Sequence, residues 1–352
     1  MKPFTIATGT MHFAQNIFLR IHTSDGLYGV GECSAFPMIV GETQNTCYAM
    51  AADLAALWKG KDPLDIPARM NELHLFTAGN STIKSAFDMA LYDIAAKQAQ
   101  QPLYQYLGGR ERIDLPTDLT IGIASPEEMA EQALSFLEMG VDLIKIKLGK
   151  VVEDDIERVA RIRAAVGPAI GLRIDANQGW DPAGAEKALT ALGAYDIQFC
   201  EQPMRSYNDH YLPALRKVSP IPIMADESVY NHHDAERLIR EKACDSVNIK
   251  LSKSGGILEA LAINATCAAA GIPCMMGGML ESRLALTAFA HLATACENIR
   301  YYDMDTCLLG HLEDPVTGGV RYDRFNVVLP GGPGIGADID PAFLSRCEGL
   351  TV

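Results

Sequence analysis

The chain has 352 residues, of which 48% are hydrophobic and 21% are charged, and its net charge at pH 7 is −14. This composition is typical of a globular protein, and the acidity argues against nucleic acid and anionic membranes as partners. The nine cysteines form no C-x-x-C pair, which indicates a reducing compartment. Because the chain also lacks a signal-peptide pattern and an apolar run of membrane-spanning length, we expect a cytoplasmic protein.

The first 112 residues are predicted to form an α+β unit. Strand patterns cover residues 16–23 and 27–33, and the Ser-Asp-Gly turn between them indicates a hairpin. Residues 45–58 and 81–100 carry apolar side chains at the three-to-four spacing of helices.

Strand and helix patterns alternate in the next part of the chain, residues 113–309. Eight such repeats predict an α/β fold, a modified TIM (β/α) barrel, with an open doubly wound sheet as the alternative. No G-x-G-x-x-G motif follows a strand, so nucleotide binding has no support. Residues 310–352 are rich in Gly and Pro, and we expect them to pack back onto the first unit and complete a capping domain. The expected strands are 118–123, 143–148, 172–175, 197–200, 223–225, 246–251, 274–276 and 300–303.

Three consecutive apolar runs end in a carboxylate, at Asp175, Glu201 and Asp226, each one βα repeat after the last. The carboxyl ends of parallel strands lie on one face of a barrel, so the three acids would converge there. Carboxylates this close repel one another, and a hard cation between them would relieve the repulsion. The alternative is that each acid caps the helix that follows it.

Three lysines are candidates for proton transfer. Lys145 and Lys147 are two residues apart and share a strand face. An amphipathic strand with a wet face is the alternative, but it fits poorly with a sheet that is covered on both sides. We expect the two ammonium groups to lower each other's pKa, which makes a better base near neutral pH. Lys250 lies one repeat after Asp226, whereas Lys253, before a Ser-Gly-Gly sequence, is expected in a solvated loop.

The last predicted strand ends in two acids, Asp303 and Asp305, which also share a face. Two further acids in the barrel mouth indicate a cation on the substrate, such as an ammonium group. The alternative is a helix cap and a surface acid. The adjacent His232 and His233 have no metal-ligand spacing and are expected to begin a helix.

The motifs KIKLG, DANQGW, EQP, ADES and NIKLSKSGG together resemble the enolase superfamily, in its muconate-lactonizing subgroup, over nearly the whole chain. The resemblance implies that Asp175, Glu201 and Asp226 bind Mg²⁺. It also implies that Lys147 and Lys250 are the acid/base pair, which removes and returns a proton α to a carboxylate through a metal-stabilised enolate.

Within the subgroup, the D-x-D of the last strand is similar to that of dipeptide epimerases, where it holds the α-ammonium group. The resemblance therefore implies an Mg²⁺-dependent epimerase that inverts the α-carbon of the C-terminal residue of a dipeptide of the L-Ala-X type. The substrate-binding residues that it implies are Thr120, Lys145, Met279, Leu280, Asp303 and Asp305.

The identity of X is left open among small, apolar and Glu. An enzyme acting on Ala-Glu should offer a cation to the glutamate side chain, but residues 7–14 contain no Arg or Lys, and Gly9 stands where we would expect one. His12 or another loop would then supply that contact.

Two alternatives remain. One is an o-succinylbenzoate synthase or cycloisomerase of the same subgroup. The other is a non-catalytic amino-acid or peptide binder, which would not need a lysine on each side of the ligand. The sequence is compatible with a homo-oligomer and does not fix its size.

Overall fold

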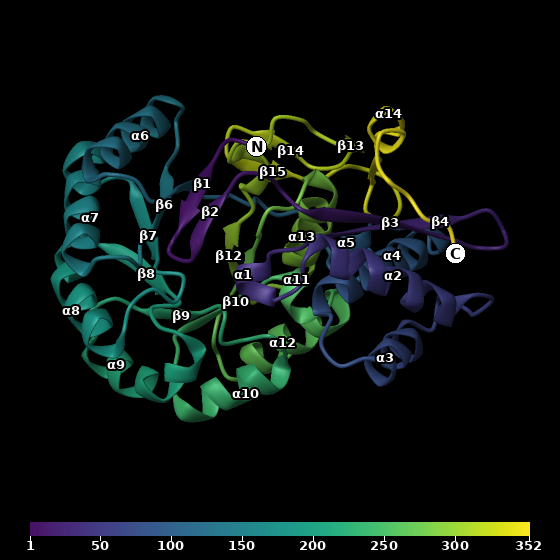
Figure 1. Ribbon diagram of the computed structural model, residues 1–352, viewed down its shortest axis with the longest axis horizontal. Coiled ribbons are helices and arrows are strands. Elements are labelled where there is room, and N and C mark those ends of the chain that lie inside the picture. Colours follow the sequence, from purple (N-terminus) through teal and green to yellow (C-terminus); the bar gives the residue numbers. More distant parts are fainter.

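The centre of the computed structural model, which describes residues 1–352, is an eight-stranded parallel sheet that curls into a barrel (Figure 1). The strands lie side by side in chain order, which confirms the barrel and excludes the doubly wound sheet, whose order would reverse. Each predicted strand agrees with the structure to within two residues at either end. The strands are β5 (Leu119–Ile121), β6 (Leu143–Lys147), β7 (Gly171–Asp175), β8 (Ile197–Glu201), β9 (Ile223–Ala225), β10 (Ser246–Ile249), β11 (Cys274–Gly277) and β12 (Ile299–Asp303).

Helices surround this barrel, and most of them bury one apolar face. The last one, Arg283–Ala295, is buried on nearly all sides. In the first of them, the buried residues are Met129, Ala133 and Phe136, at the spacing of a single helix face. Its start is fixed by a capping box in which Ser125 and Glu128 bind each other's backbone N–H groups. The helices are α6 (Pro126–Glu138), α7 (Val152–Val166), α8 (Pro182–Leu192), α9 (Leu212–Val218), α10 (His232–Glu241), α11 (Leu251–Ser254), α12 (Ile257–Ala269) and α13 (Arg283–Ala295). Helix α10 begins at His232, as predicted.

The first and last barrel strands meet without a ladder of backbone hydrogen bonds, since β5 and β12 are the two ends of the strand order. Side chains join them instead. The Met304 N–H donates to Thr117 Oγ1 at 2.8 Å, and the Thr120 N–H donates to Asp305 Oδ2 at 2.7 Å. We call this junction the seam of the barrel.

The N-terminal residues form two hairpins and a group of helices beside the barrel. The predicted hairpin is present, and its second strand packs against the long helix α4 at very short range. A Cβ atom on Gly31 would lie 1.9 Å from Ala86 O, and one on Gly29 would lie 2.0 Å from Ala90 O, so only glycine allows this approach. The elements are β1 (Phe4–Ile6), β2 (Gly9–Met11), β3 (Asn16–His22), β4 (Tyr28–Ser34), α1 (Pro37–Val40), α2 (Gln44–Trp58), α3 (Ile66–Phe76), α4 (Ser81–Gln98) and α5 (Leu103–Tyr106).

The C-terminal segment returns to these N-terminal elements. Arg20 of β3 forms an ion pair with Asp338 at 2.7 Å, and the Leu103 N–H donates to Gly334 O at 2.9 Å. Figure 1 shows this segment, in yellow, beside β3 and β4. These contacts support the proposed division of the chain into a capping domain, residues 1–112 with 310–352, and a barrel. The elements of the segment are β13 (Val316–Gly318), β14 (Arg321–Asp323), β15 (Asn326–Val328), β16 (Ala337–Ile339) and α14 (Pro341–Leu344).

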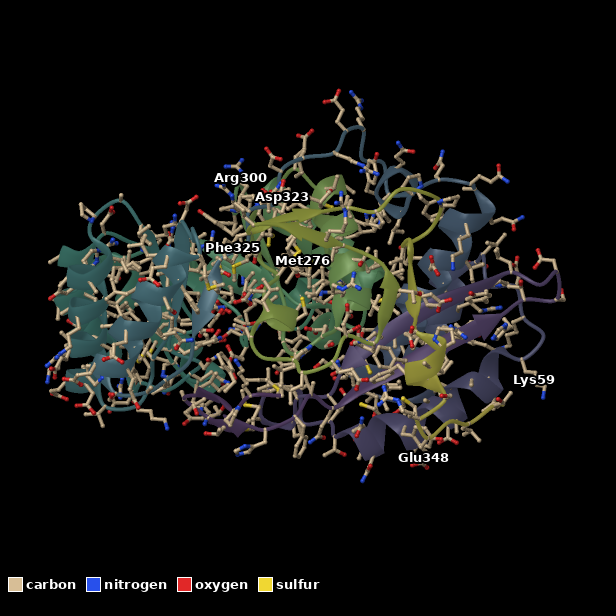
Figure 2. All side chains as sticks on the ribbon, turned by 90° about the horizontal axis from the view of Figure 1, so that it is seen from above. Lys59, Met276, Arg300, Asp323, Phe325 and Glu348 are labelled. Atoms are coloured by element: carbon tan, nitrogen blue, oxygen red, sulfur yellow. The ribbon has the colours of Figure 1, made fainter.

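The buried side chains form one large core and two small separate clusters. Met276 of β11 is fully buried within the barrel, whereas Lys59 and Glu348 are exposed at the edge of the molecule (Figure 2). None of the helices is both long and apolar enough to cross a membrane.

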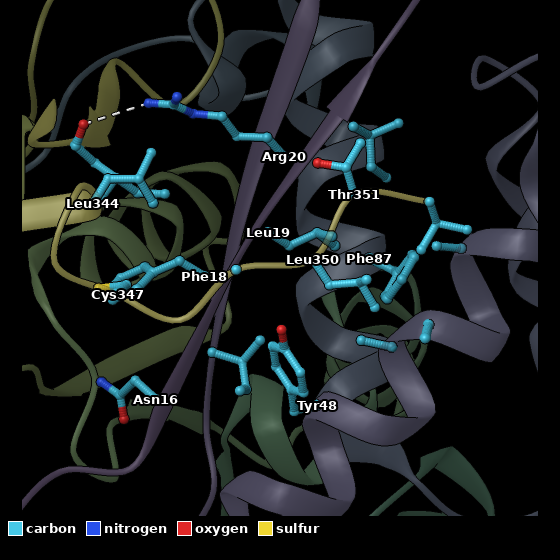
Figure 3. Close-up of a pocket in the computed structure, with 18 of the residues that line it drawn as sticks. Asn16, Phe18, Leu19, Arg20, Tyr48, Phe87, Leu344, Cys347, Leu350 and Thr351 are labelled. Atoms are coloured by element: carbon cyan, nitrogen blue, oxygen red, sulfur yellow. Dashed lines mark hydrogen bonds between the residues drawn. The ribbon is translucent and has the colours of Figure 1, made fainter.

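A cavity of about 2010 Å³ lies between β3, α2 and the C-terminal segment. Leu19, Tyr48 and Leu350 are among the residues that line it (Figure 3). None of the sequence-predicted site residues lines this cavity, so the site must be built from the barrel mouth.

Candidate active site

Three acids lie next to one another at the carboxyl end of the barrel. Asp175 ends β7, Glu201 ends β8 and Asp226 follows β9. Lys147 is the register partner of Asp175, and Asp175 is the register partner of Glu201. Asp226 directly follows β9, the next strand in order. All three acids are buried, so the βα spacing read from the sequence does bring these carboxylates together.

Lys145 reaches into the middle of this group. Its Nζ lies 2.6 Å from Glu201 Oε2, 2.7 Å from Asp303 Oδ2 and 3.4 Å from Asp175 Oδ2. The side chain is completely buried, and a buried ammonium group is tolerated only when it is paired in this way. Lys145 therefore links the three-acid group to the D-x-D of β12.

The other two lysines approach the acids separately. Lys147 Nζ lies 2.6 Å from Asp175 Oδ2, and Lys250 Nζ lies 2.8 Å from Asp226 Oδ2 and 3.9 Å from Glu201 Oε1. Lys147 ends β6 and Lys250 follows β10, four strands further around the barrel. A ligand seated over the acids would thus meet an amine from each of two sides.

The chemistry of the acids fits a divalent cation. Glu201 Oε2 and both carboxylate oxygens of Asp226 are buried and accept no hydrogen bond of normal geometry, although ammonium groups lie beside them. Burial and the nearby Asp175 raise the pKa of Glu201 to about 7, which reflects the crowding of negative charge. Three converging carboxylates are the hard oxygen ligands that Mg²⁺ takes. Asp175, Glu201 and Asp226 are therefore the residues that could hold it.

The expectation that neighbouring lysines lower each other's pKa is wrong for Lys145. Burial alone would lower its pKa, but Asp303, Glu201 and Asp175 together raise it well above its usual value. Lys250 behaves in the same way, since Asp226 and Glu201 outweigh its burial and raise its pKa. Lys145 and Lys147 share one strand, so their proximity is visible in the sequence, whereas the acids around Lys145 come from three other strands.

The expectation for Lys253 is also wrong, because its side chain is fully buried. Its ammonium group donates to Asp226 O at 2.5 Å, Val229 O at 3.0 Å and Asn248 O at 3.2 Å, and it lies 2.5 Å from Asp226 Oδ1. The short helix α11 turns it inward, where the Ser-Gly-Gly sequence suggested a loop. Lys250 and Lys253 both reach Asp226, although only Lys253 lies within the helix, so no local spacing in the sequence marks this contact.

A second group of acids lies on the seam. Carboxylate oxygens of Asp118, Asp303 and Asp305 are all within 4.8 Å of one another. Asp305 Oδ2 accepts from the Thr120 N–H, while Asp305 Oδ1 is buried without a partner. Burial, Asp303 and Asp118 raise the pKa of Asp305 well above its usual value. This crowding suits a positively charged ligand group.

Asp118 was not found by sequence reasoning, although it is two residues from Thr120 and shares its strand face. It forms a buried ion pair with Arg173, whose Nη1 lies 2.8 Å from Asp118 Oδ2. Arg173 also donates to Tyr302 O at 3.0 Å. A strand-start acid whose partner lies two strands away gives no local pattern.

The apolar side of the mouth is formed by five buried residues, which we call the mouth cluster: Ile6, Met11, Phe36, Met279 and Leu280. Its members come from the β1–β2 hairpin, the residue before α1 and the loop after β11. The predicted pocket residues Met279 and Leu280 therefore lie against the β1–β2 hairpin, through Ile6 and Met11. His12 is exposed, and residues 7–14 contain no Lys or Arg.

Comparison with known proteins identifies relatives along the whole chain. The model of the mandelate racemase / muconate lactonizing enzyme N-terminal domain matches residues 1–108, and the enolase C-terminal domain-like model matches residues 128–343. The D-Ala-D/L-Ala epimerase of Cytophaga hutchinsonii is 44% identical over 352 residues, which cover 100% of this chain and 95% of the relative. The L-Ala-D/L-Glu epimerase of Clostridium acetobutylicum is 38% identical over 340 residues, which cover 96% of this chain and 94% of the relative.

A solved structure agrees closely with the fold. The dipeptide epimerase from Cytophaga hutchinsonii, complexed with Mg and the dipeptide D-Ala-L-Val, has a TM-score of 0.97 and 45% identity, covering 99% of this chain and 94% of that one. Together with the family models and the convergence of lysines and acids at the barrel mouth, these matches show that the chain belongs to the mandelate racemase and muconate lactonizing enzyme family of the enolase superfamily.

Proposed function

We propose that the protein is a Mg²⁺-dependent dipeptide epimerase that inverts the α-carbon of the C-terminal residue of its substrate. The proposal depends mainly on the placement of Lys147 and Lys250 on two sides of the three-acid group. The acids Asp303 and Asp305 lie beyond that group. The relatives of 38–44% identity that match nearly the whole chain include dipeptide epimerases, and one of these is known in complex with Mg and a dipeptide.

In the proposed mechanism each residue has a separate task. Asp175, Glu201 and Asp226 would hold Mg²⁺, which would supply Lewis-acid stabilisation of negative charge on the substrate carboxylate. One of Lys147 and Lys250 removes the α-proton, and the other returns a proton to the opposite face, which inverts the carbon.

The remaining charged groups position the substrate. Lys145, beside Glu201 and Asp175, adds fixed positive charge where the carboxylate becomes more negative during proton removal. Asp303 and Asp305 accept hydrogen bonds from the α-ammonium group at the other end of the dipeptide, near Thr120. An o-succinylbenzoate synthase or cycloisomerase would have no ammonium group to place there, which favours the epimerase.

We propose a small or apolar second residue for the substrate. Ile6, Met11 and Phe36 pack against Met279 and Leu280, and residues 7–14 contain no Lys or Arg that could pair with a glutamate side chain. The named relatives act on dipeptides that differ in this residue, so the pocket of this chain must decide it.

The test is deuterium exchange. Purified protein with Mg²⁺, incubated in D₂O with a library of L-Ala-X and D-Ala-X dipeptides, should incorporate deuterium at the second α-carbon, as detected by mass spectrometry. Absence of exchange across the whole library would refute the proposal.

Lys147→Ala and Lys250→Ala should each abolish epimerisation, with a loss of at least about 10³-fold in kcat, because each lysine serves one face of the α-carbon. Circular dichroism of both variants should match the wild type. Near-normal turnover of either variant would disprove the two-base mechanism.

A further inference from the structure

The N-terminal elements reach the barrel through a buried carboxylate, Glu32 of β4. Its side chain is almost fully buried, and both oxygens are occupied. Oε1 accepts from the Ser282 N–H at 2.8 Å and from Asn16 Nδ2 at 2.8 Å. Oε2 accepts from Ser282 Oγ at 2.7 Å and from the Ala285 N–H at 2.9 Å. Four donors, three of them from the barrel, thus converge on one side chain of the N-terminal unit.

The three barrel donors belong to the start of α13, for which Ser282 is the N-cap. The first N–H groups of a helix have no partner within the helix, and a negative charge there is stabilised by the helix dipole. Glu32 supplies that charge from a position 250 residues earlier in the chain. The start of α13 is therefore fixed by the N-terminal unit as well as by its own sequence.

Asn16 extends the contact to the loop before the helix. Its Nδ2 group donates to Leu280 O at 3.0 Å as well as to Glu32 Oε1. The backbone carbonyl of Asn16 accepts from Gln44 Nε2 at 2.9 Å, which holds Asn16 in place. The loop from Met279 to Ser282 is thus held at Leu280 by Asn16 and at Ser282 by Glu32.

We infer that Glu32 and Asn16 are positioning residues for the pocket that receives the second residue of the dipeptide. They hold the Met279–Leu280 backbone against the barrel mouth, so the contacts of the N-terminal unit decide how large a side chain fits. The inference rests on the proposed function for its substrate. A displacement of about 1 Å in such a loop is sufficient to change the fit of a bound group strongly.

Asp88 of α4 offers a matched control. It is also a buried acid of the N-terminal unit, and it accepts from the N–H groups of Ile257 and Leu258 at the start of α12. Asp88→Asn should therefore cost stability for the same reason as Glu32→Gln, but it leaves the Met279–Leu280 loop with all its contacts.

The experiment compares Glu32→Gln, Asn16→Ala and Asp88→Asn in steady-state kinetics with Ala-Ala and Ala-Leu, in whichever configuration of the first residue the wild type accepts. Glu32→Gln and Asn16→Ala should weaken the discrimination between the two dipeptides, expressed as the ratio of their kcat/KM values, by about tenfold. Asp88→Asn should lower Tm while the ratio stays within about twofold of wild type. An unchanged ratio in both loop variants would overturn the inference.

Hydrogen exchange measured by mass spectrometry provides a readout that does not depend on turnover. Glu32→Gln and Asn16→Ala should speed exchange in the segment 279–286, and Asp88→Asn should speed it only near residue 257. Asn16→Ala carries the test if Glu32→Gln fails to fold. If the wild type exchanges no substrate proton, the proposed function fails, and unchanged protection of 279–286 in the loop variants would still reject the positioning role.

Discussion

A single buried lysine can stabilise the fold and tune the site at the same time, and Lys253 is placed to do both. Its ammonium group has three backbone carbonyl partners and the carboxylate of Asp226. Asp226 is thereby held, through both its backbone carbonyl and its carboxylate, by a fully buried side chain. Groups that orient a metal-binding side chain in this way commonly contribute on the order of 10- to 100-fold to metal affinity.

Lys253→Met should therefore weaken Mg²⁺ binding by about tenfold or more and lower Tm, because Asp226 loses its fixed partner and three carbonyl groups lose their donor. Isothermal titration calorimetry with Mg²⁺ alone measures the first effect. Lys217→Met, at an exposed lysine of α9, is the control and should change neither quantity. Wild-type Mg²⁺ affinity in Lys253→Met would show that Asp226 needs no such support.

Some elements of the N-terminal unit pack so closely that only glycine fits at the contact. Strand β4 approaches helix α4 so closely that Gly29 and Gly31 face the carbonyl groups of Ala90 and Ala86. In the sequence these glycines merely interrupt a strand pattern. The need for glycine is explained only by the tertiary structure, in which the helix packs directly on the strand. The roles of the buried acids Glu32 and Asp88 also depend on tertiary contacts, with helices of the barrel.

Gly31→Ala should lower the free energy of unfolding by about 3 kcal/mol, because the added Cβ would lie 1.9 Å from Ala86 O and the backbone must move apart. Chemical denaturation followed by circular dichroism measures the change. Gly331→Ala is the control, since its nearest neighbour would be 3.9 Å away. Equal stability of the two variants would show that β4 can shift at little cost.

For the whole molecule, His291 joins three parts of the chain that are distant in sequence. This histidine of α13 accepts from the Tyr104 N–H through Nδ1 at 3.1 Å, so its Nε2 carries the proton and donates to Ile335 O at 3.0 Å. Burial lowers the pKa of His291 from 6.5 to about 4. The ring is therefore neutral in the folded state and links a barrel helix to α5 and to the C-terminal segment.

The stability of the protein should fall as the pH drops below 6.5. In this range His291 binds a proton in the unfolded state, whereas in the folded state it stays neutral until the pH nears 4. Between pH 7 and pH 5 this single group should cost about 2 kcal/mol. Urea unfolding at both pH values checks it. His291→Gln should lose correspondingly less stability over this range, and His233→Gln, at a histidine whose side chain is 75% exposed, should behave like wild type.

The sequence predicted the barrel and the three-acid group well because both repeat along the chain. Asp175, Glu201 and Asp226 each end an apolar run at βα spacing, so their meeting follows from parallel strands alone. Glu32 and Lys253 could not be assigned in the same way. Glu32 has its barrel partners about 250 residues further along the chain. The Ser-Gly-Gly sequence after Lys253 indicated a loop, whereas the tertiary structure buries the lysine side chain.

The seam of the barrel has a consequence for how the protein loses its activity. Elsewhere neighbouring strands are held by a ladder of backbone hydrogen bonds, but β5 and β12 are joined through the side chains of Thr117 and Asp305. Local opening at this junction breaks few bonds and leaves every ladder intact, yet it separates Asp305 from Thr120. Mild denaturant should then inactivate the protein before it unfolds, and a dipeptide whose ammonium group bridges the junction should protect it.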